Sequence, residues 1–220
     1  MAFPLTHLFV ALNMVDEHGI EGSADFLLGS IAPDAVHYRK SFKGAGMAEI
    51  GRAKKHTHLC PISDEAWGSV TDNEGWLGCV KVFLEKKTYF RMGYATHVLT
   101  DIYNNQTMWS DFRTNHPLEA KKGYKSVYYD DLRHIDFLLA NNSDAIKRIC
   151  EKLTRADAIG IDGLVSSDEV EAIKQSMICE YGAPSKISSF NKFYETKIVS
   201  YDEMLIFVKE AALFCAAIVF

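Results

Sequence analysis

The 220-residue sequence lacks several features that would place a chain in a common class of protein. No stretch reaches the roughly 20 consecutive apolar residues that a membrane span requires, because Lys209 and Glu210 interrupt the most apolar segment. There is no basic excess, since 24 Lys and Arg stand against 29 Asp and Glu, for a net charge of −5. We therefore expect no transmembrane segment and no duplex nucleic acid among the partners, which leaves a small charged substrate open.

Paired cysteines are also missing. The five cysteines are odd in number and widely spaced, and no two form a C-x-x-C pair, which is the pattern of buried thiols in a reduced compartment. The first residues, MAFPLTHLFVALNMVDEHG, have no basic leading region and no small-residue cleavage site. We therefore expect no signal peptide and a cytoplasmic location. The cysteines are Cys60, Cys79, Cys150, Cys179 and Cys215.

Alternating strand patterns are almost absent, with weak candidates only near 158–165 and 195–199, and no internal repeat occurs. Apolar residues instead recur at helical spacing, and capping-box pairs begin two of these runs, at Ser166 and at Ser200. The sequence predicts an all-α fold, a multi-helix bundle that forms one domain over residues 1–220. The expected helices lie near 5–18, 24–32, 72–84, 90–102, 117–141, 167–181 and 201–218.

Four other segments are interpreted individually. Asp34 follows Pro33, so we place it on a loop just after a helix. Residues 37–52 contain three glycines among charges and resemble a mobile connection, and Ser63 is suited to begin a short helix. The segment YGAPSKISSFNKFYE, residues 181–195, is a candidate lining of a cleft, without a recognisable motif.

The segment GYATHVLTDIYNN, residues 93–105, carries polar side chains within an otherwise apolar helix. His97 and Asp101 are i,i+4 neighbours and project from one face, where both can ligate one divalent ion. Gly93, one turn before, would leave clearance for the ion, and Asn105, one turn after, would face water or substrate. A hydrogen-bonded pair on a solvated face explains the same spacing, so the pair alone does not decide between the two interpretations.

Further polar residues strengthen the metal interpretation. His7 lies in a helix that is apolar on nearly all sides, where a histidine needs an internal partner. His56 and His58 diverge, so at most one of them faces a site that contains His97. Later in the chain, Asp131 is i,i+3 to His134 and Asp130 is i,i+4 to it. Both spacings are equally consistent with a surface ion pair and with a second metal shell.

The segments THLFVA, GSIAPDA, KKHTHL and GYATHVLTD resemble, in sequence and in order, the zinc-dependent phospholipase C family. That family belongs to an all-helical superfamily that includes single-strand-specific nucleases. The resemblance covers roughly the first half of the chain. The segment YYDDLRHIDFLL is in addition similar to short bacterial members of the family, most of which have no assigned substrate.

This resemblance implies a polar cleft that holds zinc. Asp34, His58, His97 and Asp101 would form one site, and His7 with the bridging carboxylate of Asp101 would hold a neighbouring ion. The residue that matches Asp34 is also the candidate general base. In the secreted enzymes a processed N-terminal amine completes the second site, which does not suit a histidine as close to the start as His7.

The third zinc site of the secreted enzymes has no clear counterpart. Their site uses a histidine shortly after the H-x-x-x-D helix, whereas this chain has none between His97 and His116. A further ion would have to use Asp130, Asp131 and His134, with His116 as another candidate. The expectation is therefore one or two zinc ions.

The sequence thus predicts a zinc-dependent hydrolase of phosphoesters. A bound ion would lower the pKa of a water from ~15.7 towards ~7, and Asp34 would orient or deprotonate that water. The expected substrate is a small phosphoester or a phospholipid headgroup. Two alternatives remain: a noncatalytic helical module that retains the fold and binds a headgroup or a protein, and a metal-dependent hydrolase of a non-phosphate substrate.

Overall fold

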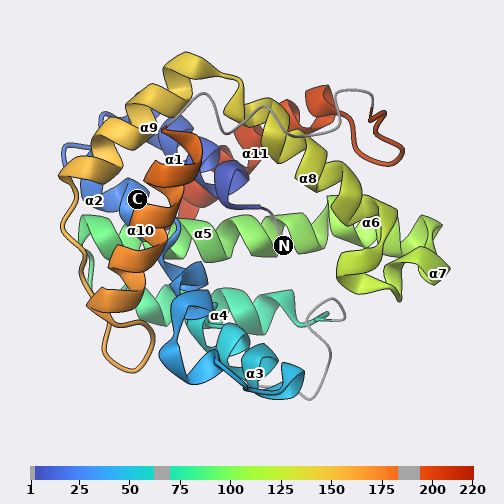
Figure 1. The fold of residues 1–220 in the computed structure, drawn as a ribbon, viewed down its shortest axis with the longest axis horizontal. Coiled ribbons are helices and arrows are strands. Elements are labelled where there is room, and N and C mark those ends of the chain that lie inside the picture. Colours follow the sequence, from blue (N-terminus) through green and yellow to red (C-terminus); the bar gives the residue numbers. More distant parts are fainter. Residues whose placement is uncertain (1–2, 62–69, 183–193) are drawn as a thin grey trace.

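The computed structural model describes residues 3–61, 70–182 and 194–220 (Figure 1). Every regular element in these ranges is a helix, and their only β contact is an isolated bridge between Ile161 and Val165. The all-α prediction is therefore confirmed for the described residues. The α-helices are α1 (Pro4–His18), α2 (Ser23–Gly29), α3 (Met47–Thr57), α4 (Asn73–Phe83), α5 (Tyr89–Gln106), α6 (Met108–Asn115), α7 (Pro117–Ala120), α8 (Val127–Ala140), α9 (Ser143–Arg155), α10 (Ser167–Tyr181) and α11 (Tyr201–Val219), and the 3-10 helices are η1 (Ala32–Tyr38), η2 (Lys40–Phe42) and η4 (Gly123–Lys125).

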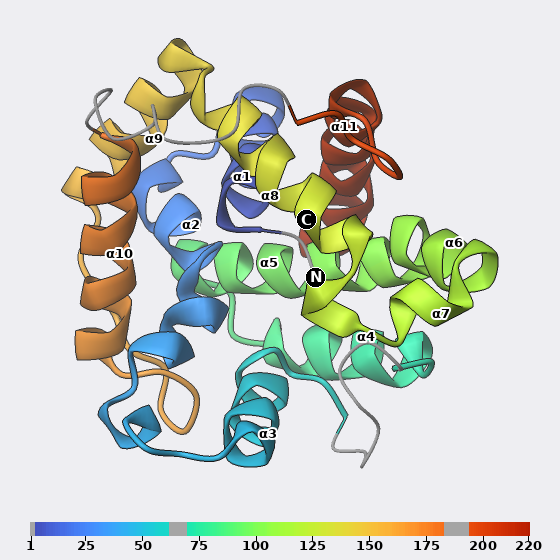
Figure 2. The ribbon, with the colours of Figure 1, turned by 45° about the vertical axis from the view of Figure 1, so that its right-hand side comes forward.

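Helix α5 crosses the middle of the molecule, with α3 and α4 on one side and α1 and α11 on the other (Figures 1 and 2). It contacts α1, α2, α4, α6 and α11. Every residue from Met92 to Ile102 is buried, so no face of this stretch is solvated. His97 and Asp101 therefore lie inside the protein, and the interpretation as a solvated surface pair is wrong.

Two glycines bring α2 and α5 into close contact. A methyl group on Gly93 would overlap the carbonyl oxygen of Phe26, and one on Gly29 would overlap the carbonyl oxygen of Phe90. The two backbones can therefore approach only because neither position carries a Cβ atom. Gly93 serves this packing, and the expected clearance for an ion is not its role.

The first helix is fixed at both ends. Pro4 occupies its first turn, and the amide of Leu5 donates to Oδ1 of the buried Asp136 at 3.1 Å. Gly19 ends the helix in the left-handed conformation, with a φ of 59°, and donates its amide to the carbonyl of Val15. These anchors set the position of α1 and of His7 within it.

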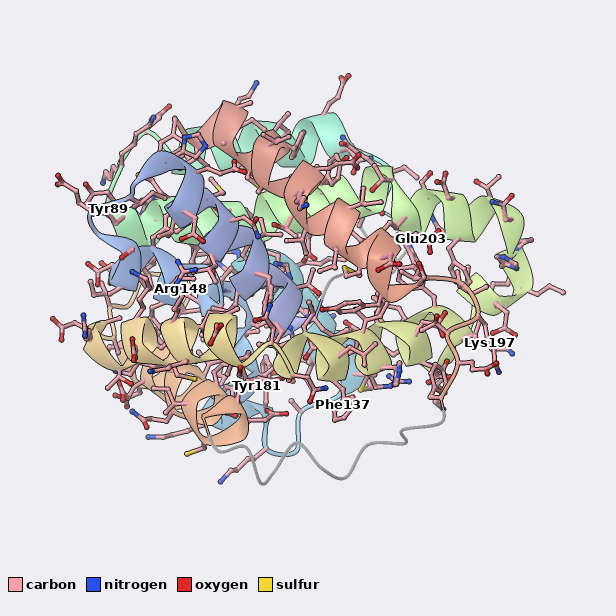
Figure 3. All side chains as sticks on the ribbon, turned by 90° about the horizontal axis from the view of Figure 1, so that it is seen from above. Tyr89, Phe137, Arg148, Tyr181, Lys197 and Glu203 are labelled. Carbon is pink, nitrogen blue, oxygen red and sulfur yellow. The ribbon has the colours of Figure 1, made fainter. Side chains whose placement is uncertain are left out.

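Helices α9 and α10 hold the N-terminal part of the chain. Arg148 of α9 points toward α1 and donates to Oδ2 of Asp16 at 3.1 Å (Figure 3). Arg39, directly after η1, donates to Oε1 of Glu169 in α10 and to the carbonyl of Leu164, each at 2.7 Å. Because η1 carries Asp34, the link to α10 also fixes the position of the Asp34 carboxylate.

Both predicted capping boxes are present, at the start of α10 and of α11.

Several helix boundaries differ from those predicted from the sequence. Asp34 lies within η1 and not on a loop, and residues 37–52 contain η2 and the first half of α3, so they are not an irregular connection. The expected helix near 117–141 is divided into α7, η4 and α8. No strand forms near 195–199, and the helix expected at Ser63 lies outside the described residues.

Helices α6 and α9 were not predicted from the sequence. Asn142 caps α9, and Ile146, Ile149 and Leu153 form its buried face at helical spacing.

A single cluster of buried apolar side chains extends from Leu5 to Val219. Within the described ranges, no helix combines the length and the apolar character that crossing a membrane would require.

Candidate metal centre

Five polar side chains from four segments meet beside the middle of α5. Each is at least largely buried, although the segments are far apart in the sequence. The structure therefore brings together the residues that the sequence analysis grouped around one or two ions. They are His7 of α1, Asp34 of η1, His58 directly after α3, and His97 and Asp101 of α5.

His58 and His97 face each other through their Nε2 atoms, which are 3.1 Å apart. The Nδ1 atom of His58 lies 2.8 Å from the carbonyl oxygen of Lys54, and that of His97 lies 2.8 Å from the carbonyl oxygen of Ser30. Since a carbonyl can only accept, each Nδ1 carries the ring proton when the ring is neutral. Two unprotonated Nε2 atoms then point at the same position, an arrangement that a cation between them would stabilise.

Two carboxylates flank this position. Oδ1 of Asp34 lies 3.4 Å from Nε2 of His58, and Oδ2 of Asp34 lies 4.0 Å from Nε2 of His97. Oδ2 of Asp101 lies 3.8 Å and 4.0 Å from the same two nitrogens. Two nitrogens bound at about 2.05 Å to one tetrahedral zinc ion would be roughly 3.3 Å apart, so the arrangement fits a small divalent ion.

His7 extends the cluster on the other side of His97. The two imidazoles are stacked, with ring centroids 3.6 Å apart and an angle of 9° between the planes. Nε2 of His7 lies 3.7 Å from Oδ1 of Asp101, and neither nitrogen of His7 has a hydrogen-bond partner within the described ranges. Burying an imidazole without hydrogen-bond partners costs free energy unless an ion or a water binds to its nitrogens.

Asp101 therefore faces two potential sites with its two oxygens. His7, His97 and Asp101 form one group of converging ligand atoms, and Asp34, His58 and His97 form a second. Nitrogen and carboxylate ligands in this number are the set that zinc or a similar ion prefers. The Nδ1 hydrogen bonds to backbone carbonyls also match the outer contacts that orient histidine ligands around metals.

The electrostatics keep the ligands in the states that metal binding needs. Burial lowers the pKa of His97 well below its ordinary value, and the nearby His7 lowers it further. Burial also lowers the pKa of His7, although the Asp101 carboxylate opposes this shift. Both rings are therefore neutral at pH 7 and can offer a nitrogen lone pair to an ion.

Asp34 behaves differently, because it lies between the cluster and the cavity described below. Burial raises its pKa, but the positive charge of the nearby Lys54 ammonium is the largest of the causes that oppose this and hold the pKa well below the ordinary value. Nζ of Lys54 lies 3.2 Å from Oδ1 of Asp34. Asp34 is therefore ionised, as a metal ligand must be, and it is a weak proton acceptor.

Residues outside the cluster fix the turn that carries His58. The indole Nε1 of Trp76 donates to the carbonyl oxygen of His58 at 2.8 Å, and the Tyr94 hydroxyl donates to the carbonyl oxygen of Thr57. Both aromatic residues lie within helices that the apolar spacing predicts, near 72–84 and 90–102. Nothing in a helical spacing pattern indicates a hydrogen bond to a residue 18 or 37 positions away.

Asp131 and His134 are not part of the cluster; neither belongs to a group of converging ligand atoms among the described residues. Oδ2 of Asp131 accepts hydrogen bonds from the amides of Lys197, Ile198 and Val199 at 2.6–3.0 Å, and Oδ1 accepts one from the Tyr194 hydroxyl at 2.7 Å. These bonds hold the segment before α11 against α8. The expectation of a metal role for Asp131 is therefore corrected to a structural one.

Asn105 and His56 both lie outside the cluster. The amide nitrogen of Asn105 donates to the carbonyl oxygen of Val70 and to Oδ1 of Asn73, so this side chain holds the start of α4 and does not face the cluster. His56 is exposed and contacts the carbonyl oxygen of Gly163 at 2.9 Å. Only His58 of the H-x-H pair faces the site, as predicted.

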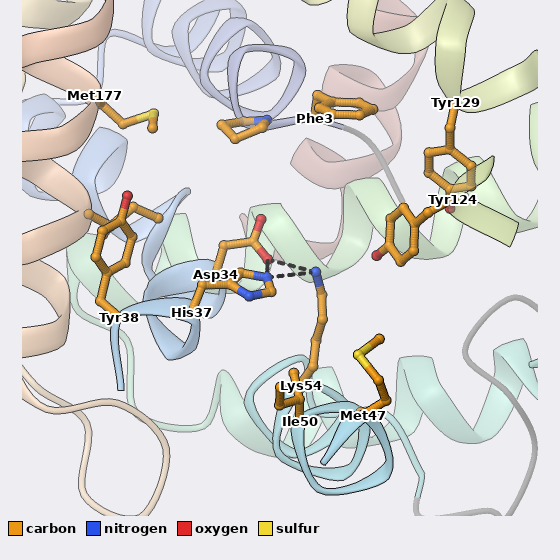
Figure 4. Close-up of a pocket in the computed structure, with 13 residues that line it drawn as sticks. Phe3, Asp34, His37, Tyr38, Met47, Ile50, Lys54, Tyr124, Tyr129 and Met177 are labelled. Atoms are coloured by element: carbon orange, nitrogen blue, oxygen red, sulfur yellow. Dashed lines mark hydrogen bonds and ion pairs between the residues drawn. The ribbon is translucent and has the colours of Figure 1, made fainter. Parts of the chain in front are cut away.

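A cavity of about 440 Å³ lies beside Asp34 (Figure 4). Of the five cluster residues, only Asp34 lines it, and its side chain is 14 % exposed whereas the other four are at most 1 % exposed. Asp34 and Lys54 form the charged part of the wall, with His37 beside them, and most of the other lining residues are apolar or aromatic. A ligand would therefore reach the cluster past Asp34. Residues 183–193 of the predicted cleft lining lie outside the described residues.

Comparison of the chain with protein-family models, with curated proteins and with solved structures finds no match. The function must therefore be argued from the chemistry of the site.

Proposed function

We propose that the protein is a metal-dependent hydrolase of phosphoesters, of the type of the zinc-dependent phospholipases C and single-strand nucleases. The observation that carries the proposal is the convergence of two imidazole nitrogens, 3.1 Å apart on rings whose other nitrogens face backbone carbonyls, with two largely buried carboxylates. Zinc is the ion best suited to imidazole and carboxylate ligands in this number. One ion would be held by Asp34, His58, His97 and Asp101, and a second by His7 and Asp101.

When bound, zinc supplies a water of lowered pKa and neutralises developing charge on a phosphoryl oxygen. The protein itself orients the histidine rings and aligns the water. The carbonyl groups of Lys54 and Ser30 fix the two histidine rings, so the ligand nitrogens need little reorganisation. Asp34, on the cavity side, accepts a hydrogen bond from the attacking water and aligns it. Its low pKa makes alignment the better role than proton removal.

The proposal is tested by comparing two histidines that are two residues apart. His58→Ala removes a ligand nitrogen, whereas His56→Ala removes an exposed ring outside the cluster. With zinc supplied and bis(4-nitrophenyl) phosphate as substrate, we expect His58→Ala to lose both bound zinc and at least about 100-fold in turnover. We expect His56→Ala to keep both.

Three results would count against the proposal. Wild-type protein without bound metal, or equal turnover by His58→Ala and wild-type protein, would contradict a metal-dependent hydrolase. Stoichiometric zinc without turnover of any phosphoester would favour the noncatalytic binding module. Turnover of carboxylic esters or amides alone would favour hydrolysis of a non-phosphate substrate.

A further inference from the structure

Lys54 has two roles in the candidate centre. Its carbonyl oxygen accepts the hydrogen bond that orients the His58 ring, and its side chain reaches Asp34 at the edge of the cavity. Nζ also lies 3.0 Å from Nε2 of His37 (Figure 4). The ammonium is therefore held at the boundary between the ligand cluster and the cavity, one carboxylate away from His58.

The charges around Lys54 do not balance once an ion is present. Asp34 and Asp101 together compensate one divalent ion, and histidine binds a metal as a neutral ring, so it adds no charge. Among the residues that the structure describes, Asp34 is the only carboxylate within 4.0 Å of the Lys54 ammonium. The side chain of Lys54 is 13 % exposed, so water screens its charge only in part. With a single ion bound, the centre therefore leaves one positive charge to be matched by an anion.

The surroundings show where such an anion would lie. In Figure 4, Phe3, Tyr124 and Tyr129 stand across the cavity from Tyr38 and Met177, and the Lys54 ammonium projects between these walls beside Asp34. A cavity of about 440 Å³ is within the size range of small-molecule sites. It offers a cation at one end and apolar surface for an organic group around it.

We infer that the Lys54 ammonium binds the anionic phosphoryl oxygen of the substrate and makes the centre selective for a singly charged phosphoester whose organic group lies in this cavity. The inference rests on the proposed function, since it requires an ion in the adjacent cluster. His37 acts as a positioning residue, because its Nε2 accepts from the ammonium and keeps it at the cavity.

The test measures binding of diphenyl phosphate, a singly charged probe, to zinc-loaded protein by calorimetry. Lys54→Met keeps the apolar stem and the carbonyl oxygen but removes the charge, and Lys54→Arg keeps the charge. Lys43→Met removes a similar charge from an exposed position outside the cavity lining. We expect Lys54→Met to weaken binding about tenfold or more with its zinc retained, Lys54→Arg to stay within about threefold of wild type, and Lys43→Met to bind as wild type does.

The outcomes separate the inference from the proposed function. If zinc-loaded Lys54→Met binds diphenyl phosphate as tightly as wild type, or if the zinc-loaded wild type does not bind it, the inference is overturned while a metal centre stands. Loss of zinc from Lys54→Met would give Lys54 a purely structural role and would also overturn it. Wild-type protein that binds no zinc would overturn the proposed function itself.

Discussion

The Nε2 atoms of His58 and His97 lie 3.1 Å apart while the Nδ1 atom of each ring is held by a backbone carbonyl. This relationship favours the proposed metal centre over a pair of core histidines that satisfy one another. In such a pair one ring donates to the other, whereas here both ring protons are directed away from the shared position. Four predictions follow from the cluster and from the helices around it.

Zinc should stabilise the folded protein, and His97→Ala should abolish this effect. A ligand at 100 times its Kd stabilises the native state by about 2.7 kcal/mol, which corresponds to a rise in Tm of about 5–10 °C for a chain of this size. Thermal unfolding with and without zinc measures the shift. An equal rise for wild-type protein and His97→Ala would mean that zinc binds elsewhere.

Trp76→Phe should weaken zinc binding more than it weakens the fold. The substitution removes the hydrogen bond to the carbonyl oxygen of His58, so the turn that carries this ligand is less well fixed. We expect a loss of about tenfold in zinc affinity, the lower end for contacts around metal ligands. Trp109→Phe, which changes another buried indole, is the control and should keep the affinity. Equal zinc affinities for the two variants would contradict the role of Trp76.

Gly93→Ala should destabilise the protein although alanine favours helices. The added methyl group would overlap the carbonyl oxygen of Phe26 and force α2 and α5 apart, at a cost of about 1–3 kcal/mol or more. Gly78→Ala in α4 meets nothing within 4 Å and should be neutral or stabilise by up to about 1 kcal/mol. Urea unfolding of both variants gives the comparison. A stable Gly93→Ala variant would show that the helices can separate freely.

Asp136 should contribute less to the stability of the fold as the pH rises from about 4 to 7. Burial raises the pKa of Asp136 from its ordinary 3.8 to about 7, against the hydrogen bonds from Tyr181 and Leu5 that lower it. The folded chain thus keeps a proton that the unfolded chain loses above its pKa of about 3.8, so this contribution to the unfolding free energy declines with pH up to about 7 and is constant above it.

Asp136→Asn removes the titrating group while an amide oxygen can still accept from Leu5. The difference in unfolding free energy between wild-type protein and this variant should therefore change between pH 4 and 7 and stay level above it. Urea titrations at several pH values measure this difference. A difference independent of pH would contradict the raised pKa.

Two kinds of signal in the sequence indicated the five cluster residues. His7 and His97 are polar within apolar helices, and Asp34, His58 and Asp101 occur in the order of a known ligand set. What the sequence could not provide is the direction of each side chain. Asp131 looked like a ligand beside His134, but its oxygens are used by backbone amides 66–68 residues away.

The fold was predicted where local patterns are strong and was missed where tertiary contacts decide. Helix α3 contains Gly51 and many charges, so its sequence indicated a loop. The contacts of the following turn with Trp76 and Tyr94 hold its C-terminal end in place. Gly93 was interpreted as space for an ion because its sequence neighbours are His97 and Asp101, whereas its nearest neighbour across the helix interface is Phe26. The sequence did not indicate a role for Lys54, because a lysine next to another lysine, here Lys55, is normally a surface residue.

The most direct test of the metal centre is the metal content and metal position of protein purified without chelators. Elemental analysis together with anomalous diffraction at the zinc edge should find at least one ion per chain, bound by Nε2 of both His58 and His97. Protein without stoichiometric metal after incubation with zinc, or an ion bound away from these two nitrogens, would contradict the account.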